Sequence, residues 1–546
     1  MKRIFLLFLC VCLMLGCFTA CGKKNDIQVV LPDVITGEGP SYTWDKSPVE
    51  ISAYIGLEGY GYKWDTNIVS MKHLTDTTGV SLKIQSGNNE RLNAMVATGK
   101  LPDIIVLNDV NNPIRHQLEE KNMVWDFDTL IEKYAPEMKI PESMHTWYEY
   151  KDGKLYGYPS YFGAVEDMQK YPEVVKYEYH NKLIVRKDLC DHLGIGLDEF
   201  STKDGFISAL KKVKDARITV SGSVVAPVYF YTVPHPLRIA QLFGMALEDE
   251  KGDWVEVRKH KKYKEAILFI NRMYREGLIP EDAWTATADT IDSKLNNGAV
   301  FSLFDKSSCG NLVELSRVKN DATFVAVNPP KSDDGANPAI TAVSTSGWTW
   351  LAIPKTTKIP DRVIRFLYYM TTDEGQLLNY YGVEGVTYEF DDNGRVKYTK
   401  EAENLIVNDR NAAANKYGFG YFSWMFNWST YQRFNPISNR PTAVADRQIN
   451  DFYRDYVYDA RCAELVEPES GSDLLALQTK IDTYWNQEEA KMMRASSEKE
   501  AEKIYDAAIK KIDKMGLDKI YKYKNNKFHD NKDLFDIEFI YEGNAK

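Results

Sequence analysis

The chain has 546 residues, of which 44% are apolar and 27% are charged, so its length allows two to four ordinary globular domains. The formal net charge is −10 and no basic stripe interrupts it, which argues against nucleic acid as a partner. Aromatic residues are numerous, with 34 Tyr, 23 Phe and 11 Trp. Core packing accounts for most of them, but an excess of Tyr and Trp also suits a surface that stacks on sugars.

The N-terminus carries an export signal. Two basic residues precede an apolar run from Ile4 to Leu15, which is too short to span a bilayer as a mature helix. Small residues before Cys21 resemble a lipoprotein lipobox, so we predict a signal peptide over residues 1–20 and lipid attachment at Cys21. Phe18 departs from the usual Leu of that motif, which leaves Cys17 as a second candidate and an ordinary secretory leader as the alternative.

After a polar segment that we interpret as a flexible tether, strands alternate with helices. This alternation predicts a mostly parallel sheet covered on both faces. The expected elements are a strand over Val49–Ile55, a helix over Asn67–Thr78, a strand over Val80–Gln85, a helix over Asn89–Ala97 and a buried strand over Ile104–Leu107. Asn108 and Asp109 follow this last strand, and open α/β sheets bind ligands at strand carboxyl ends. Alternatively, Asp109 or the Asn111-Asn112 pair caps the next helix.

Further along, Tyr263 to Arg275 has the pattern of an amphipathic helix, and the strand that ends at Phe304 stops in a polar-aromatic loop. Residues 214–222 lack the alternating acidic ligands of a calcium loop, so we expect no calcium there. Asp391 to Gly394 is predicted to be a hairpin turn. A capping box at Ser497 opens a last helix that ends at Gly516, and a polar tail follows.

Nothing in the sequence points to chemistry. Histidine is scarce, and no Gly-x-Ser-x-Gly elbow, P-loop or HExxH is present. Beyond the leader, Cys190, Cys309 and Cys462 have no metal-binding spacing and are expected to be buried free thiols. We therefore predict no enzyme activity, no cofactor and no metal.

Three stretches carry a family resemblance. They are the strand, lysine-bearing turn, helix and "TDEG" of Gly347 to Gly385, the run ATGKLPDIIVLND that ends at Asp109, and YREGLIPEDAW, which ends at Trp284. Together they resemble the extracellular solute-binding proteins of carbohydrate ABC importers, in the superfamily of maltose-binding protein and its long lipoprotein branch of Gram-positive bacteria.

The resemblance implies a periplasmic-binding-protein-like (type 2) α/β fold, with two α/β lobes joined by a multi-strand hinge. We expect a signal peptide at 1–20, a tether at 21–47, an N-terminal lobe at 48–165 and 344–380, a C-terminal lobe at 166–343 and 381–525, and a loose tail at 526–546.

Site residues follow from the same resemblance. Tyr161 occupies a position where the family offers an aromatic ring to the ligand, although a packed hinge tyrosine is the alternative. Phe304 and Asp305 carry over from a sugar-stacking loop, with a core position as the alternative for Phe304. Our complete set of ligand-binding candidates is Trp64, Asn108, Asp109, Tyr161, Tyr229, Phe304, Asp305, Trp348, Glu384, Trp424, Trp428 and Arg440.

By resemblance, the protein is a monomeric, lipid-anchored binding protein on the extracellular face of the cell membrane. It would capture an oligosaccharide between its lobes and deliver it to ABC permease subunits. Two rival classes remain open: a binder of peptides or another solute on the same fold, and a secreted glycan-processing enzyme.

Overall fold

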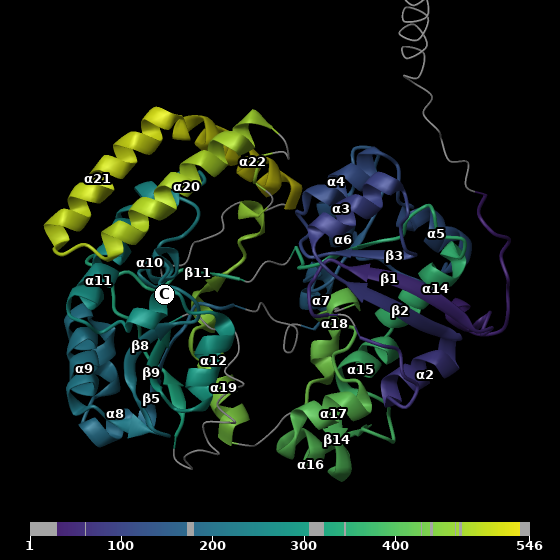
Figure 1. Ribbon diagram of the computed structural model, residues 1–546, viewed down its shortest axis with the longest axis horizontal. Helices are drawn as coiled ribbons and strands as arrows, with labels where there is room; N and C mark the ends of the chain where they lie inside the picture. The colour runs from purple at the N-terminus through teal and green to yellow at the C-terminus, as the bar shows by residue number, and fades with distance from the viewer. Residues whose placement is uncertain are drawn as a thin grey trace, which may run out of the picture.

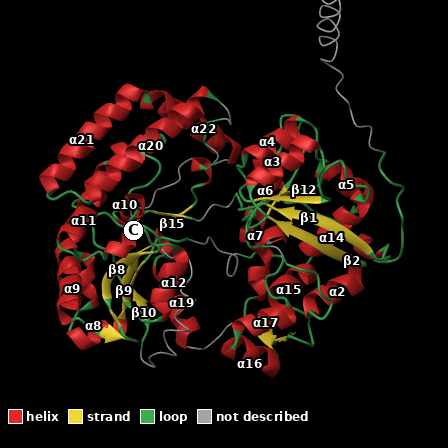
Figure 2. Cartoon of the chain, in the orientation of Figure 1, coloured by secondary structure: helices red, strands yellow, loops and turns green. Residues whose placement is uncertain are grey.

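The computed structural model describes residues 30–60, 62–171, 179–304, 322–342, 346–426, 429–436, 441–464, 466–468 and 472–535. These residues form two α/β lobes that lie side by side (Figures 1 and 2). Two large, separate clusters of buried apolar side chains, one in each lobe, account for this division. The predicted two-lobed α/β architecture is therefore confirmed.

The N-terminal lobe is built on a five-stranded sheet in the order β2-β1-β3-β12-β4. β1, β2 and β3 are parallel, whereas β12 lies antiparallel between β3 and β4. The strands are β1 (Val49–Ile55), β2 (Val80–Ser86), β3 (Ile104–Leu107), β4 (Tyr158–Pro159) and β12 (Trp350–Ala352). The helices of this lobe are α2 (Val69–Thr78), α3 (Asn89–Thr98), α4 (Pro113–Glu120), α5 (Phe127–Tyr134), α6 (Glu142–Tyr148), α7 (Val165–Lys170), α14 (Pro360–Thr371) and α15 (Asp373–Tyr381).

The C-terminal lobe contains a four-stranded sheet in the order β10-β5-β9-β8. Its strands are β5 (Leu183–Arg186), β8 (Ala226–Phe230), β9 (Val300–Phe304) and β10 (Phe324–Ala326). Its first helices are α8 (Lys187–Leu193), α9 (Lys203–Ala216), α10 (Pro236–Leu242), α11 (Lys261–Arg275) and α12 (Ala288–Asn296). Short strand pairs join β6 (Thr219–Val220) to β7 (Ser223–Val224) and β11 (Ile340–Thr341) to β15 (Val457–Tyr458).

The assignment of residues 381–436 to the C-terminal lobe is wrong. Tyr388 and Val396, from β13 (Tyr388–Phe390) and β14 (Val396–Tyr398), cover the apolar face of α15, so the chain stays on the same lobe. Phe422 and Met425 then complete the N-lobe core. The elements between them are α16 (Lys400–Asn408), α17 (Arg410–Tyr417) and α18 (Ser423–Phe426). Among the described helices that follow α15, α19 (Pro441–Phe452) is the first that packs on the C-terminal lobe.

The first crossing between lobes also lies later than predicted. Ala164 belongs to the N-lobe core, and Glu166 of α7 accepts hydrogen bonds from Ser143 of α6. Tyr179 is the next described residue buried in a core, and it belongs to the C-terminal lobe. The chain therefore leaves the N-terminal lobe after α7 rather than at residue 166.

The predicted loose tail at 526–546 is wrong for residues up to Phe535. Gly516 adopts a φ of +111° and ends α21 (Glu498–Met515), after which α22 (Leu517–Phe535) begins at once. Leu517, Ile520 and Phe528 are fully buried, which fixes this helix against the lobe. Together with α20 (Asp473–Met493) and α21, α22 forms a helical layer along the top of the C-terminal lobe in Figure 1.

Two local predictions are confirmed. Asp391 accepts hydrogen bonds from the backbone N–H groups of Asn393 and Arg395 and so closes the β13–β14 hairpin. Cys190 and Cys462 are buried free thiols, and Cys309 lies outside the described residues. The leader and Cys21 also lie outside them. Within the described ranges, no helix combines the length and apolar character that a bilayer crossing requires.

His260 should make the stability of the C-terminal lobe sensitive to acid. Burial, followed by the positive charges of Lys262 and Lys261, lowers the pKa of His260 to about 4 against the opposing effect of Asp334. Because an unfolded histidine titrates near 6.5, the unfolded chain binds the additional proton as the pH falls from about 6.5 towards 4. Stability contributed by neutral His260 is therefore present above pH 6.5 and is lost through that window.

We expect His260→Asn to reduce the loss of stability between pH 7.5 and pH 5. Asparagine keeps the helix cap, because His260 Nδ1 accepts the N–H of Lys262 at 3.2 Å and an asparagine oxygen can do the same. Urea midpoints at the two pH values measure the effect. Equal losses in the variant and the parent protein would contradict the assignment.

Candidate functional site

Three aromatic side chains gather at one edge of the N-lobe sheet. β1, β3 and β4 end at this edge, and the antiparallel β12 begins there. Tyr60 follows β1, Tyr161 follows β4, and Trp348 precedes β12. The Trp348 ring centroid lies 5.7 Å from that of Tyr161 and 6.4 Å from that of Tyr60, both in edge-to-face geometry. We call these three rings the aromatic shelf.

The aromatic shelf is exposed although its members are large. Tyr60, Tyr161 and Trp348 keep 42%, 40% and 38% of their surface in solvent. Among the described residues, they are the only Tyr or Trp side chains in the set of large exposed apolar residues. Contiguous exposed apolar surface marks binding sites more often than scattered single residues do. The shelf is therefore the strongest candidate for a ligand platform in the described chain.

Backbone pairing fixes Trp348 in place. Its N–H donates to the carbonyl of Ser160 at 2.8 Å, and the N–H of Val110 donates to the Trp348 carbonyl at 3.0 Å. Gly347 has a φ of +103°, and a Cβ there would lie 2.8 Å from the Ser160 carbonyl oxygen. Only glycine fits this approach, because it combines a positive φ with the absence of a side chain.

A buried cation contacts β12, the strand that follows Trp348. Arg115 of α4 donates from Nε to Glu119 at 2.7 Å and from Nη1 to the Val110 carbonyl at 3.2 Å. Its guanidinium also lies 4.9 Å from the centroid of the Tyr148 ring and 5.4 Å from that of Trp350. These contacts link α4 to α6 and β12, because Tyr148 belongs to α6 and Trp350 to β12.

Polar groups border the shelf on the β3–α4 loop. Asp109 is exposed, and its Oδ1 accepts the N–H of Asn111 at 2.7 Å. Asn108 Oδ1 accepts from the Asn112 side chain at 2.8 Å. Asn112, not Asp109, caps α4, since its side chain accepts the N–H of Ile114. The capping alternative therefore applies to Asn112 and leaves the Asp109 carboxylate at the edge of the sheet.

The two described C-lobe candidates are buried. Phe304 is 1% exposed and stacks on Phe230 at 5.4 Å, so its burial favours the core alternative. Tyr229 is 2% exposed and donates to Asp282 at 2.7 Å. Burial, followed by this hydrogen bond, raises the pKa of Tyr229 far above its ordinary value. Phe304 therefore offers no free face, whereas Tyr229 borders a hollow beside α12, away from the aromatic shelf.

The remaining candidates do not join the shelf in the described structure. Trp64 is half-buried against Phe422, with ring centroids 6.1 Å apart, and its Nε1 donates to Thr75 at 3.2 Å. Glu384 is exposed in the loop between α15 and β13. Asp305, Trp428, Arg440 and the side chain of Trp424 lie outside the described residues.

Sequence reasoning missed Tyr60. The signal was its place directly after the first strand, since the rule that draws attention to residues after β3 applies equally to those after β1. The intervening glycines of the segment Gly56–Tyr60 made it look like a plain loop.

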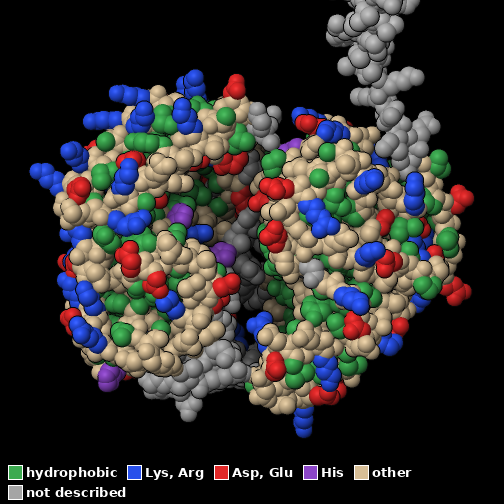
Figure 3. Space-filling model, viewed as in Figure 1, with side chains coloured by type: hydrophobic (Ala, Val, Ile, Leu, Met, Phe, Trp, Pro, Cys, Tyr) green, Lys and Arg blue, Asp and Glu red, His purple; other side chains and the backbone are tan. Residues whose placement is uncertain are grey.

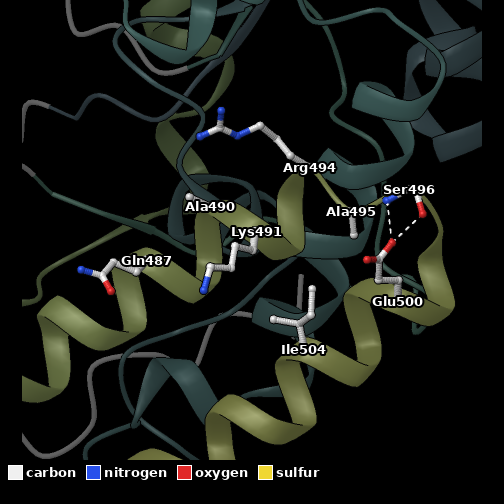
Figure 4. A pocket seen from close by; sticks show the side chains of 8 residues that line it. All are labelled: Gln487, Ala490, Lys491, Arg494, Ala495, Ser496, Glu500 and Ile504. Atoms are coloured by element: carbon white, nitrogen blue, oxygen red, sulfur yellow. Dashed lines mark hydrogen bonds between the residues drawn. The ribbon is translucent and has the colours of Figure 1, made fainter.

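A hollow separates the two lobes in the space-filling view (Figure 3). Two other hollows lie on the C-terminal lobe and include no shelf residue. One, of about 790 Å³, lies between α20 and α21, where Glu500 accepts hydrogen bonds from Ser496 (Figure 4). The other, of about 540 Å³, lies beside α12 and is lined partly by Lys294 and by the predicted site residue Tyr229. No group of three His, Cys, Asp or Glu side chains suited to a metal ion occurs in the described part of the chain.

Solved structures of binding proteins share this fold. The ABC-transporter substrate-binding protein FusA of S. pneumoniae, solved with kestose, has a TM-score of 0.68 at 15% identity, over 89% of this chain and 100% of its own. The N-glycan transport solute-binding protein NgtS of Streptococcus pneumoniae gives 0.59 at 17% identity, over 89% and 99%. The alginate-binding protein AlgQ2 gives 0.63 at 16%, over 88% and 98%. The predicted type 2 binding-protein fold is confirmed.

Sequence comparison agrees with the fold. Lipoprotein LipO of Bacillus subtilis (strain 168) is 23% identical over 409 residues, which cover 71% of this chain and 72% of the relative. The model of the bacterial extracellular solute-binding protein family matches residues 71–403, which span both lobes. The chain belongs to the family of bacterial extracellular solute-binding proteins.

Proposed function

We propose that this protein is the lipid-anchored substrate-binding component of an ABC importer and that it captures an oligosaccharide on the aromatic shelf. The observation that carries the proposal is the gathering of three exposed rings at the carboxyl edge of the N-lobe sheet. Ligands of open α/β sheets bind at that edge. FusA, solved with kestose, and NgtS, named for N-glycan transport, support a sugar as the ligand class.

The chemistry of the shelf suits a sugar. Aromatic faces bury the apolar side of a pyranose or furanose ring, whereas carboxylate and amide groups satisfy its hydroxyls. Trp348 and Tyr161 supply the faces, and Asp109 and Asn108 supply acceptors from the loop that is hydrogen-bonded to Trp348. A hydrogen bond from a hydroxyl to the Asp109 carboxylate is charge-assisted and therefore stronger than a neutral one.

Capture then proceeds by closure. The solute first binds the shelf on the N-terminal lobe, and the C-terminal lobe moves over it. The closed arrangement is stabilised by the contacts that the ligand adds to it and to no other arrangement. Permease subunits recognise the closed form and accept the solute, and no bond of the solute is broken.

The rival classes make different predictions. A saturating ligand raises the melting temperature, by the equivalent of about 2.7 kcal/mol at a hundredfold excess over Kd. A thermal-shift panel of neutral oligosaccharides, uronate oligosaccharides and peptides separates sugar binding from binding of another solute. Peptide responses without any sugar response would overturn the sugar assignment, and release of shorter sugars by the purified protein would establish an enzyme instead.

Trp348→Ala should weaken binding of the responding oligosaccharide without unfolding the protein. Removing a ring that acts as a binding hot spot typically costs about 2 kcal/mol, or roughly 30-fold in Kd. Isothermal titration calorimetry measures the change. Phe390→Ala is the matched control, because Phe390 has the same 38% exposure but lies on the β13–β14 hairpin. Equal effects of the two substitutions would remove the shelf from the site.

Tyr161→Gly should weaken binding at little cost in stability, because relief of backbone strain offsets the loss of the ring's contact with Trp348. Tyr161 adopts a φ of +60°, a left-handed conformation that strains residues with a side chain by about 1–2 kcal/mol and that glycine adopts freely. Strain that persists at an exposed ring is typical of a functional position. Urea denaturation measures the stability, and isothermal titration calorimetry of the same sample measures the binding. Tyr161→Phe is the control, because it retains both the strain and the ring.

Cys21→Ala should release the protein from the membrane fraction into the medium. The proposed diacyl anchor rests on the lipobox-like leader that ends at Cys21, and its acyl chains would hold the protein at the membrane. Fractionation of cells and metabolic labelling with a fatty acid provide the measurement. Cys17→Ala is the control and should leave attachment and labelling intact; the reverse pattern would move the anchor to Cys17.

A further inference from the structure

The last helix is fixed to the C-terminal lobe along most of its length. Asn525 accepts the backbone N–H of Trp254 at 2.7 Å, and His529 lies 2.8 Å from Asp253. Phe528 is fully buried. Lys532 pairs with the buried carboxylate of Glu248. With these contacts in successive turns, α22 must move as part of that lobe.

The end of the same helix reaches the other lobe. The Phe535 ring packs on Trp147 of α6, with ring centroids 4.6 Å apart and an interplanar angle of 33°. Trp147 is only 7% exposed and belongs to the N-lobe core. Arg461, whose neighbour Cys462 accepts a hydrogen bond from Asn531 of α22, lies 5.3 Å from the centroid of the Phe535 ring. Figure 1 shows α22 extending across the top of the gap between the lobes. We call the pair Phe535 and Trp147 the interlobe clasp.

The interlobe clasp coexists with an exposed binding surface. All three shelf rings keep about two-fifths of their surface in solvent, so the C-terminal lobe does not cover them in this arrangement. Covering them requires the C-terminal lobe to move relative to α6. Because α22 moves with the C-terminal lobe, the same motion displaces Phe535 from Trp147.

We propose that the interlobe clasp stabilises the shelf-exposed arrangement, and that Phe535 and Trp147 therefore determine ligand affinity without touching the ligand. A contact that exists only before closure is lost when the ligand closes the lobes. Its loss costs free energy, so the contact lowers the apparent affinity for the ligand. The affinity part of this inference rests on the proposed function. The conformational part does not, because it concerns the free protein.

Phe535→Ala is expected to tighten binding of the responding oligosaccharide by roughly 2- to 10-fold, the equivalent of one aromatic pair. Trp147→Leu should act in the same direction. The double variant should gain little over either single variant, since each already breaks the contact. Leu534→Ala is the matched control, because Leu534 is the preceding residue of α22 and is 54% exposed. It should leave the affinity unchanged.

A measurement without ligand separates the clasp from the proposed function. Dyes on unnatural amino acids at Lys100 and Asp215, both exposed and on opposite lobes, report the lobe separation by single-molecule FRET. The Phe535→Ala protein should populate an additional, closed-like state more than the parent protein and the Leu534→Ala control do.

The outcomes distinguish failure of the interlobe clasp from failure of the proposed function. If no sugar binds but the free Phe535→Ala protein shifts its lobe separation, the clasp stands and the proposed function fails. An unchanged separation, or a weaker rather than a tighter affinity, would overturn the clasp. Additive effects in the double variant would also overturn it, because they would mean that Phe535 and Trp147 act through different partners.

Discussion

The structure depends on the pairing of β12 between β3 and β4. Trp350 is opposite Leu107 on one side and Pro159 on the other, so this late strand closes a sheet whose other strands come from the start of the chain. Its antiparallel direction places the residues that precede it at the edge where the parallel strands end. Trp348 therefore lies next to Tyr60 and Tyr161 because β12 runs antiparallel to β3. The same pairing brings the Trp350 ring next to the Arg115 guanidinium, which stabilises this strand.

Local patterns in the sequence are sufficient for the first three strands of the N-terminal lobe. β1, β2 and β3 were predicted from apolar runs bounded by turns, and they form where expected because they are buried within a sheet. Local patterns cannot predict to which lobe residues 381–436 belong. An aromatic-rich segment has the same composition whichever core it completes, and only the contact of Phe422 and Met425 with the N-lobe core decides the question.

Composition also fails to predict the C-terminal helix α22. Residues after Asn525 are mostly polar, so composition predicts a solvated tail. The helix persists because polar side chains find specific partners: Lys532 at Glu248 and Asn531 at the Cys462 carbonyl. For the site, the rule that ligands bind at strand ends predicts Asp109, and the family resemblance predicts Tyr161. Tyr60 cannot be predicted without knowing which loops lie at the same edge of the sheet. Phe304 was carried over by position, yet its ring turns into the core.

The place of β12 in the chain has a consequence for biogenesis. An exported polypeptide, as we propose this chain to be, emerges amino end first. Its N-lobe sheet then lacks an interior strand until all of the C-lobe sheet has passed through the translocation channel. Until then β4 has no partner, since β12 is the only strand with which it pairs in the described sheet. Sequence-distant pairing of this kind slows folding and leaves unpaired edges open to misassociation. Maturation of the earliest-exported lobe is thus timed by the arrival of one of its latest strands.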